Sequence, residues 1–101
     1  MVILKSDSYD EIRKAVENSK ISILETNFSL NQVLCKLMHK NKISLLVNLD
    51  RLIEKNKKEK ALKLKKMLFN IKLCKKYKVL VEFKADKMNK EEIKAIKDFL
   101  A

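Results

Sequence analysis

The 101-residue sequence contains no glycine, no proline and no tryptophan. The lack of glycine excludes the phosphate-binding loop of P-loop NTPases and the dinucleotide-binding turn of Rossmann enzymes, because both require glycine. Tight turns that need positive φ must then use asparagine or aspartate, which tolerate that conformation. The candidates for such turns are Asn18, Asn27, Asn41, Asn56, Asp86 and Asn89.

Residues that bind metals or act as nucleophiles are also scarce. Cys35 and Cys74 are the only cysteines and His39 is the only histidine, which leaves too few ligands for a structural zinc site. We expect both cysteines to be reduced core residues. We expect His39 to be a solvated cation near a helix C-terminus. No cofactor is expected.

Long apolar runs are missing as well. A helix needs about 20 consecutive apolar residues to cross a bilayer, and no segment approaches that length. The amino-terminal residues turn polar too early for a signal peptide. We therefore expect one cytoplasmic domain over residues 1–101, without a membrane partner.

What the sequence does contain is a regular alternation of two patterns. Short apolar runs rich in β-branched residues predict strands at residues 2–4, 21–24, 43–47 and 79–83. A segment with helical apolar spacing follows each run. This alternation predicts an α/β fold of four βα units with a parallel sheet, which amounts to half of a TIM barrel. A lone sheet of this kind exposes two edges, so a partner or an open sandwich is needed.

The expected helices each have a buried face. The first follows a cap within residues 6–8 and should bury Ile12, Ala15 and Val16. The second follows Ser29 as its N-cap and should bury Leu30, Val33, Leu34, Leu37 and Met38. The fourth begins near Asn89, and its buried face should comprise Ile93, Ile96, Phe99 and Leu100.

The third helix, over about residues 57–76, carries two apolar stripes. The broad one should cover the sheet and comprises Ala61, Leu64, Met67, Leu68, Ile71 and Cys74. The narrow one, formed by Leu62, Phe69 and Leu73, either completes the packing or meets another protein. One border of the narrow stripe holds Lys65, Lys72 and Lys76, and the other holds Lys63 and Lys66.

Most of the net charge lies around this helix. Residues 55–78 contain eleven lysines and one acid, Glu59, so they account for ten of the eleven net positive charges. Repulsion among these positive charges costs stability unless an anionic partner offsets it. Nucleic acid is the leading candidate, because lysines can neutralise regularly spaced phosphates. With only two arginines, the contacts should be to the backbone and not to base edges. The candidate RNA-binding residues are Lys57, Lys58, Lys60, Lys63, Lys65, Lys66, Lys72, Lys75, Lys76 and Lys78.

The sequence also fits two other interpretations. A basic amphipathic helix can also lie on an anionic membrane surface, but here its broad apolar face is needed to cover the sheet. Glu25, Asp50 and Asp86 each follow a predicted strand, where a barrel places its active site, and could together bind a divalent cation. No spacing supports that hydrolase hypothesis beyond the position in the fold.

Several stretches resemble the TIM-barrel protein subunit of archaeal and eukaryotic ribonuclease P, called protein component 3 or the thirty-kilodalton subunit. The stretch VILKSDSYDEIRKAVENSKISILE is similar to its strand–helix–strand segment, with Arg13 and the Val-Glu-Asn of residues 16–18 in matching places. NKISLLVNLDRLI resembles a further strand and turn, where Asn48 and Leu49 match. A basic helix, Lys-Tyr-Lys-Val at 76–79 and the strand VLVEF follow in the family's order.

The resemblance covers nearly the whole chain but only the C-terminal part of the family's barrel. The family's N-terminal strands are absent, and residues 84–86 lack its usual serine. The resemblance implies a noncatalytic, RNA-binding subunit of the ribonuclease that removes the 5′ leader from precursor tRNA. It implies as partners the ribonuclease P RNA, precursor tRNA and a small RNA-recognition-like protein subunit. A homodimer or a second chain could complete the barrel. The alternative is an unrelated α/β binding module for RNA or an acidic protein.

Overall fold

The chain forms a parallel four-stranded sheet with a helix after each strand. The computed structural model describes residues 2–53 and 56–100. The elements are β1 (Ile3–Lys5), α1 (Tyr9–Glu17), β2 (Ile23–Glu25), α2 (Gln32–Lys40), β3 (Ser44–Asn48), the 3₁₀ helix η1 (Leu49–Leu52), α3 (Lys57–Lys76), β4 (Val81–Lys84) and α4 (Lys90–Leu100). The sheet order is β1-β2-β3-β4, all parallel. The predicted α/β fold of four βα units is confirmed.

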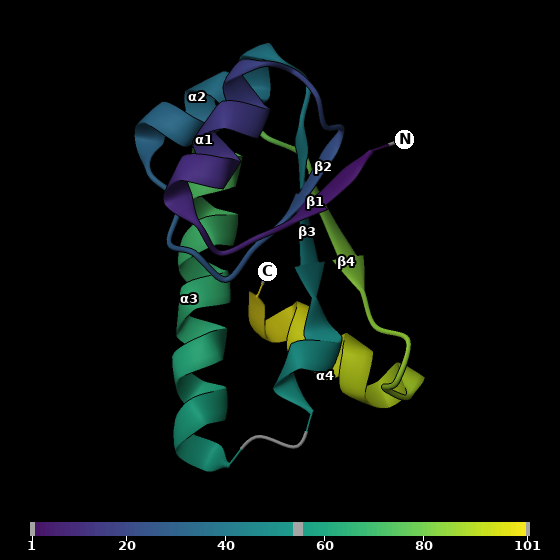
Figure 1. Ribbon diagram of the computed structural model, residues 1–101. Coiled ribbons are helices and arrows are strands. Elements are labelled where there is room, and N and C mark those ends of the chain that lie inside the picture. Colours follow the sequence, from purple (N-terminus) through teal and green to yellow (C-terminus); the bar gives the residue numbers. More distant parts are fainter. Residues whose placement is uncertain (1, 54–55, 101) are drawn as a thin grey trace.

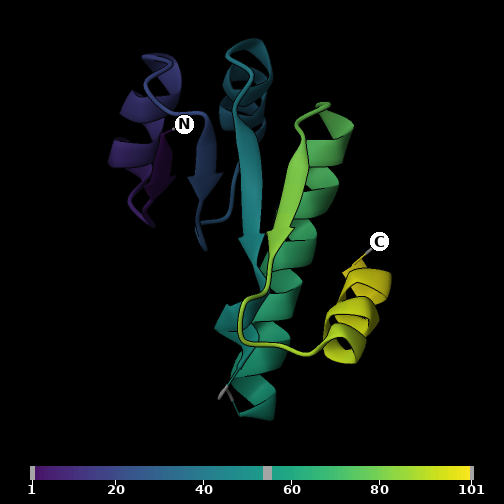
Figure 2. The same cartoon turned by 90° about the vertical axis from the view of Figure 1, so that its right-hand side faces the viewer.

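The helices do not cover both faces of the sheet. α1, α2 and α3 lie along one face (Figure 1), and a view rotated by 90° shows the strands in front of α2 and α3 (Figure 2). No element of residues 2–53 or 56–100 covers the opposite face in that view. Strands that follow one another in sequence order, with their helices on one side, form half of a barrel wall.

The core lies between the sheet and these helices. Leu24 in β2 and Leu45 in β3 are buried at neighbouring register positions, and Ile12 and Val16 of α1 are buried as predicted. α2 buries Leu34, Cys35 and Met38, whereas Val33 is 42% exposed, so its assignment to the buried face was wrong. Ile93 and Ile96 of α4 pack partly buried against the core. The side chains of Phe99 and Leu100 lie outside the described part of the structure.

The N-cap of α2 is Asn31 and not the predicted Ser29. The Asn31 side chain accepts a hydrogen bond from the backbone N–H of Leu34 at 2.9 Å. The helix starts two residues later than expected, and ahead of it the Leu30 N–H donates to the Asn70 side chain. At α1, Ser8 occupies the N-cap position without a capping side-chain bond, and Asp7 accepts the N–H of Asn27.

The predicted sites of positive φ were wrong. Among the described residues, positive φ occurs at Ser19, Lys42 and Lys78, with φ of 53°, 56° and 61°. Each lies one residue beyond the C-cap of α1, α2 or α3. There the backbone closes a Schellman motif, which requires the left-handed conformation at the residue after the cap. Asn18 and Asn41 are the C-caps themselves, with φ of −85° and −95°.

Both cysteines are buried, as predicted, and they are free thiols. A hydrogen bond to Cys35 and, to a lesser extent, burial raise the pKa of the Cys74 thiol. Among the described residues, no helix is both long and apolar enough to cross a membrane.

Candidate nucleic-acid interface

The candidate interface is the outer surface of α3, the longest helix of the described chain. The helix begins at a side-chain cap, where Asn56 accepts the Glu59 N–H at 2.8 Å, and Glu59 is the only acid in its first turn. Lys75 and Lys76 lie in the last turn, where cations complement the helix dipole. Beyond the sheet, the amino-terminal half of α3 runs beside η1 (Figures 1 and 2).

The inner face of α3 fixes the helix on the sheet. Met67, Ile71 and Cys74 are buried, and Leu64 and Leu68 are half-buried against the core. This confirms most of the broad apolar stripe, but Ala61, in the second turn of α3, is exposed. Of the narrow stripe, Leu73 packs partly buried against the core, whereas Leu62 and Phe69 are 55% and 49% exposed.

A polar contact on the inner face was missed from the sequence. Asn70 is only 3% exposed and lies among the apolar residues of α3. Its side-chain amide donates to the Phe28 carbonyl at 2.9 Å, and its carbonyl accepts the Leu30 N–H at 2.9 Å. These bonds tie the β2–α2 loop to α3. The available signal was a polar residue on a stripe that is otherwise apolar.

The outer surface presents the predicted lysines to solvent. Nine of the ten predicted lysines are exposed: Lys57, Lys58, Lys60, Lys65, Lys66, Lys72, Lys75 and Lys76 on α3 itself, and Lys78 beyond its C-terminal end. Lys63 is half-buried, and with Glu59, Leu62 and Lys66 it lines a shallow cavity of about 320 Å³. At the other end of the helix, the Lys76 Nζ lies 5.7 Å from the centroid of the Tyr77 ring. The structure thus places the lysines of α3 along a helix about 30 Å long, since each helical residue adds about 1.5 Å.

The exposed lysines of α3 are not neutralised by acids within the described residues. The ion pairs found there join Lys5 and Arg51 to Glu25, Arg13 to Glu17, and Lys84 to Asp86. None of these pairs includes an exposed lysine of α3. The positive charge on the outer surface is therefore available to an anionic partner.

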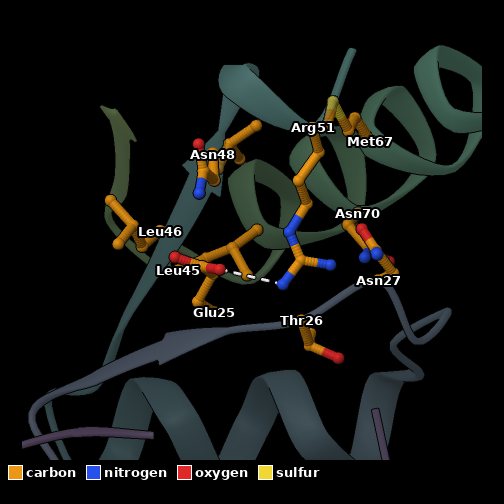
Figure 3. Close-up of a pocket in the computed structure, with 10 residues that line it drawn as sticks. Glu25, Thr26, Asn27, Leu45, Leu46, Asn48, Arg51, Met67 and Asn70 are labelled. Atoms are coloured by element: carbon orange, nitrogen blue, oxygen red, sulfur yellow. Dashed lines mark hydrogen bonds and ion pairs between the residues drawn. The ribbon is translucent and has the colours of Figure 1, made fainter. Parts of the chain in front are cut away.

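The three acids of the hydrolase hypothesis are engaged elsewhere. Glu25 is buried and accepts a hydrogen bond from Arg51 Nη2 at 2.8 Å (Figure 3), and Lys5 Nζ lies 3.6 Å from the same oxygen. Asp50 accepts the backbone N–H groups of Asp86 and Lys87 at 3.0 and 2.9 Å. In the part of the chain that the structure describes, no three Asp, Glu, His or Cys side chains are placed to hold a metal ion. The structure gives no support to that hypothesis.

Comparison with solved structures shows a likeness in fold. No protein-family model matches the sequence, and no curated protein matches it. A chain in the cryo-EM structure of archaeal ribonuclease P with mature tRNA superposes with a TM-score of 0.88 at 24% sequence identity. The superposition covers 100% of this chain and 49% of that chain, so the present chain spans about half the length of its structural neighbour. At this identity the likeness shows the fold, and the four βα units correspond to half of the longer chain.

Proposed function

We propose that this chain is a noncatalytic, RNA-binding protein subunit of ribonuclease P. In this role it supports the removal of the 5′ leader from precursor tRNA by the catalytic RNA. The observation that carries the proposal is the combination of a lysine-lined outer helix with a fold like that of a chain in an archaeal ribonuclease P complex.

The chemistry of the surface fits an RNA backbone. Lysine binds as a point charge that is suited to phosphate oxygens and does not read base edges. A row of exposed lysines along α3 can neutralise several phosphates and release their counterions. The acids at the C-terminal ends of the strands hold structural contacts, so the proposal assigns the catalytic chemistry to the RNA.

The proposed partners are the ribonuclease P RNA, precursor tRNA and a small RNA-recognition-like protein subunit. A further partner would cover the open face of the sheet, because parallel sheets are normally buried on both sides. Ile3 in β1 and Leu80 beside β4 are 53% and 73% exposed at the two edge strands. A second copy of the chain or another half-barrel chain would bury both edges, and sedimentation of the purified chain distinguishes a dimer from a monomer.

A specific observation favours a second candidate function. Leu62 and Phe69 are large, exposed apolar side chains on a helix bordered by lysines. That combination also suits an acidic protein with an apolar helix face, so an unrelated binding module is the alternative.

Reconstitution tests the proposal directly. Archaeal ribonuclease P RNA would be combined with its other protein subunits, with the thirty-kilodalton subunit omitted, and cleavage of precursor tRNA would be measured with and without this chain. We expect the chain to raise the cleavage rate and to bind the RNA with an affinity that falls as salt increases. A preparation in which Lys65, Lys72 and Lys76 are changed to Gln should show less of this gain, and one in which Lys87, Lys90 and Lys94 are changed to Gln serves as the matched control. No gain in cleavage and no salt-dependent binding would refute the proposal.

A further inference from the structure

A second cationic feature lies away from the outer surface of α3, at the N-terminal ends of β3 and β4. A cavity of about 480 Å³ opens there between the α2–β3 and α3–β4 junctions. Its basic lining residues are His39, Lys40, Lys42 and Lys78, and none of its described lining residues is acidic. Met38, Ile43 and Val79 form buried apolar walls, and Leu80 is 73% exposed beside them. The volume falls within the range of about 300–1,000 Å³ that is typical of small-ligand sites.

Two of these lysines occupy positions where lysine is unfavourable. Lys42 and Lys78 have φ of 56° and 61°, and this left-handed conformation is unfavourable for a residue with a Cβ. Each closes the same Schellman motif. The N–H of Lys42 bonds to the His39 carbonyl and that of Lys78 to the Lys75 carbonyl. Glycine or asparagine would fill either position at lower cost. Backbone strain of this kind concentrates at functional sites.

The fold brings the two strained lysines to one cavity because their junctions are neighbours. β3 and β4 pair in parallel, and the Leu45 N–H donates to the Leu80 carbonyl at 2.8 Å. His39 Nδ1 lies 3.2 Å from the Lys78 carbonyl oxygen, which links the end of α2 to the end of α3. The equivalent position at the α1–β2 junction is Ser19, so lysine is not a general requirement of this turn.

Compensation of the helix dipoles does not explain the strained lysines. The C-termini of α2 and α3 do favour cations, but Lys40, Lys75 and Lys76 already supply them from the last helical turns. In the described structure, Lys40, Lys42 and Lys78 form no ion pair with an acid. Their charges therefore converge on a cavity that no described acid neutralises.

We propose that this cavity binds a phosphate group of single-stranded RNA, with the attached nucleoside against Leu80. Lys40, Lys42 and Lys78 supply the point charges for the phosphate, and the apolar wall supplies a surface for the ribose or base. The choice of RNA as the ligand rests on the proposed function, and the cavity adds a second contact that is separate from α3's outer surface. A nucleotide held there has its phosphate at the N-terminal end of the sheet.

The test measures binding of a 5′-phosphorylated trinucleotide of uridine by backbone NMR shifts. We expect the largest shifts at the amides of residues 42–44 and 78–80. The variant Lys42→Asn/Lys78→Asn removes both charges and suits the left-handed backbone, so it should stay folded or gain stability. Loss of this phosphate contact should lower the slope of log affinity against log salt by up to about 0.7, the value per neutralised phosphate for single strands.

Two control variants separate charge from strain. Lys87→Gln/Lys94→Gln removes the same charge from exposed positions outside the cavity, and Ser19→Asn changes the strained residue at the α1–β2 junction without altering the cavity. Both should bind the trinucleotide like the unaltered chain. Absence of shifts at residues 42–44 and 78–80, or equal loss in Lys87→Gln/Lys94→Gln, overturns the proposal. Equal shifts and affinity with inorganic phosphate overturn the assignment to RNA.

The outcome is independent of the test of the proposed function. If the cavity variant binds the trinucleotide normally while the Lys65, Lys72 and Lys76 variant loses ribonuclease P RNA, the cavity proposal fails alone. If the trinucleotide binds in the cavity but reconstituted cleavage does not respond to the chain, the ribonuclease P assignment fails while an RNA site stands.

Discussion

Asn70 in the middle of α3 donates a 2.9 Å hydrogen bond to the backbone carbonyl of Phe28, which lies 42 residues earlier. The same side chain accepts the N–H of Leu30 at 2.9 Å. Leu30 is only 2% exposed, so water cannot readily replace this partner. One buried amide thus satisfies two backbone groups of the β2–α2 loop and fixes α3 relative to α2.

Replacement of Asn70 by Ala should therefore cost about 2–4 kcal/mol of unfolding free energy. Each of the two backbone groups left without a partner loses roughly 1–3 kcal/mol when it stays buried. Urea denaturation followed by circular dichroism measures the loss. Lys72→Ala, an exposed change two residues along the same helix, should alter the unfolding free energy by less than about 0.5 kcal/mol. Equal losses in both variants would contradict the role given to Asn70.

The contrast between α3 as a whole and the two hydrogen bonds of Asn70 shows what the sequence could predict. Apolar spacing predicted α3, most of its buried residues and most of its exposed lysines, because helical periodicity depends on neighbouring residues alone. The Asn70 contacts join residues about 40 positions apart, and no local pattern encodes such a pairing. The grouping of Lys42 with Lys78 escaped prediction for the same reason.

The prediction of the left-handed turn residues was wrong for a different physical reason. Asparagine was expected in the left-handed conformation, yet Asn41 is the C-cap of α2 and uses its side chain to donate to the Val16 carbonyl at 2.6 Å. The left-handed residue is Lys42, one position later. Residue preference placed the left-handed residue one position too early, because the Schellman motif needs that conformation at the residue after the cap.

The buried ion pair between Glu25 and Arg51 yields a second prediction. The Glu25 side chain is 7% exposed, and Arg51 is its nearer cationic partner, at 2.8 Å (Figure 3). Arg51→Met leaves that carboxylate with Lys5, whose side chain is 68% exposed. We expect a loss of about 3 kcal/mol in unfolding free energy, because an uncompensated buried charge is costly.

A double-mutant cycle checks the cause of that loss. Glu25→Gln combined with Arg51→Met removes the charge together with its partner, so it should be more stable than Arg51→Met alone. Lys5→Met serves as the control and should cost less than about 1 kcal/mol, as exposed pairs do. If the double variant is no more stable than Arg51→Met, lost packing and not charge explains the effect.

A third prediction concerns Cys74. The hydrogen bond to Cys35 and burial raise the pKa of this thiol above its ordinary value of 9.0. The unfolded chain releases the Cys74 proton near pH 9 while the folded chain retains it. The stability that this raised pKa contributes is therefore fully present below pH 9 and is lost as the pH rises further.

Alkylation with iodoacetamide at pH 8, read by mass spectrometry, tests this protection. Because the thiolate is the nucleophile, Cys74 should react at least about 10³-fold more slowly in the folded chain than in concentrated urea. An exposed thiol introduced by Lys66→Cys should react at once in the folded chain, which checks that the reagent is active. Rapid native labelling of Cys74 would show that the α2–α3 contact opens readily.

The fourth prediction identifies which border of α3 faces RNA. Lys65, Lys72 and Lys76 are spaced seven and four residues apart, so they share one side of the helix, and all three are exposed. Changing them together to Gln should leave the unfolding free energy nearly unchanged, because none belongs to the core. The slope of log affinity against log salt for ribonuclease P RNA should fall by up to about 0.9 per lost phosphate contact with a duplex.

The matched control changes Lys87, Lys90 and Lys94 to Gln, which removes the same charge from the α4 side of the molecule. If both triple variants lower the slope equally, general attraction by net charge explains binding. If neither lowers it, the RNA contacts lie elsewhere than on this side of α3.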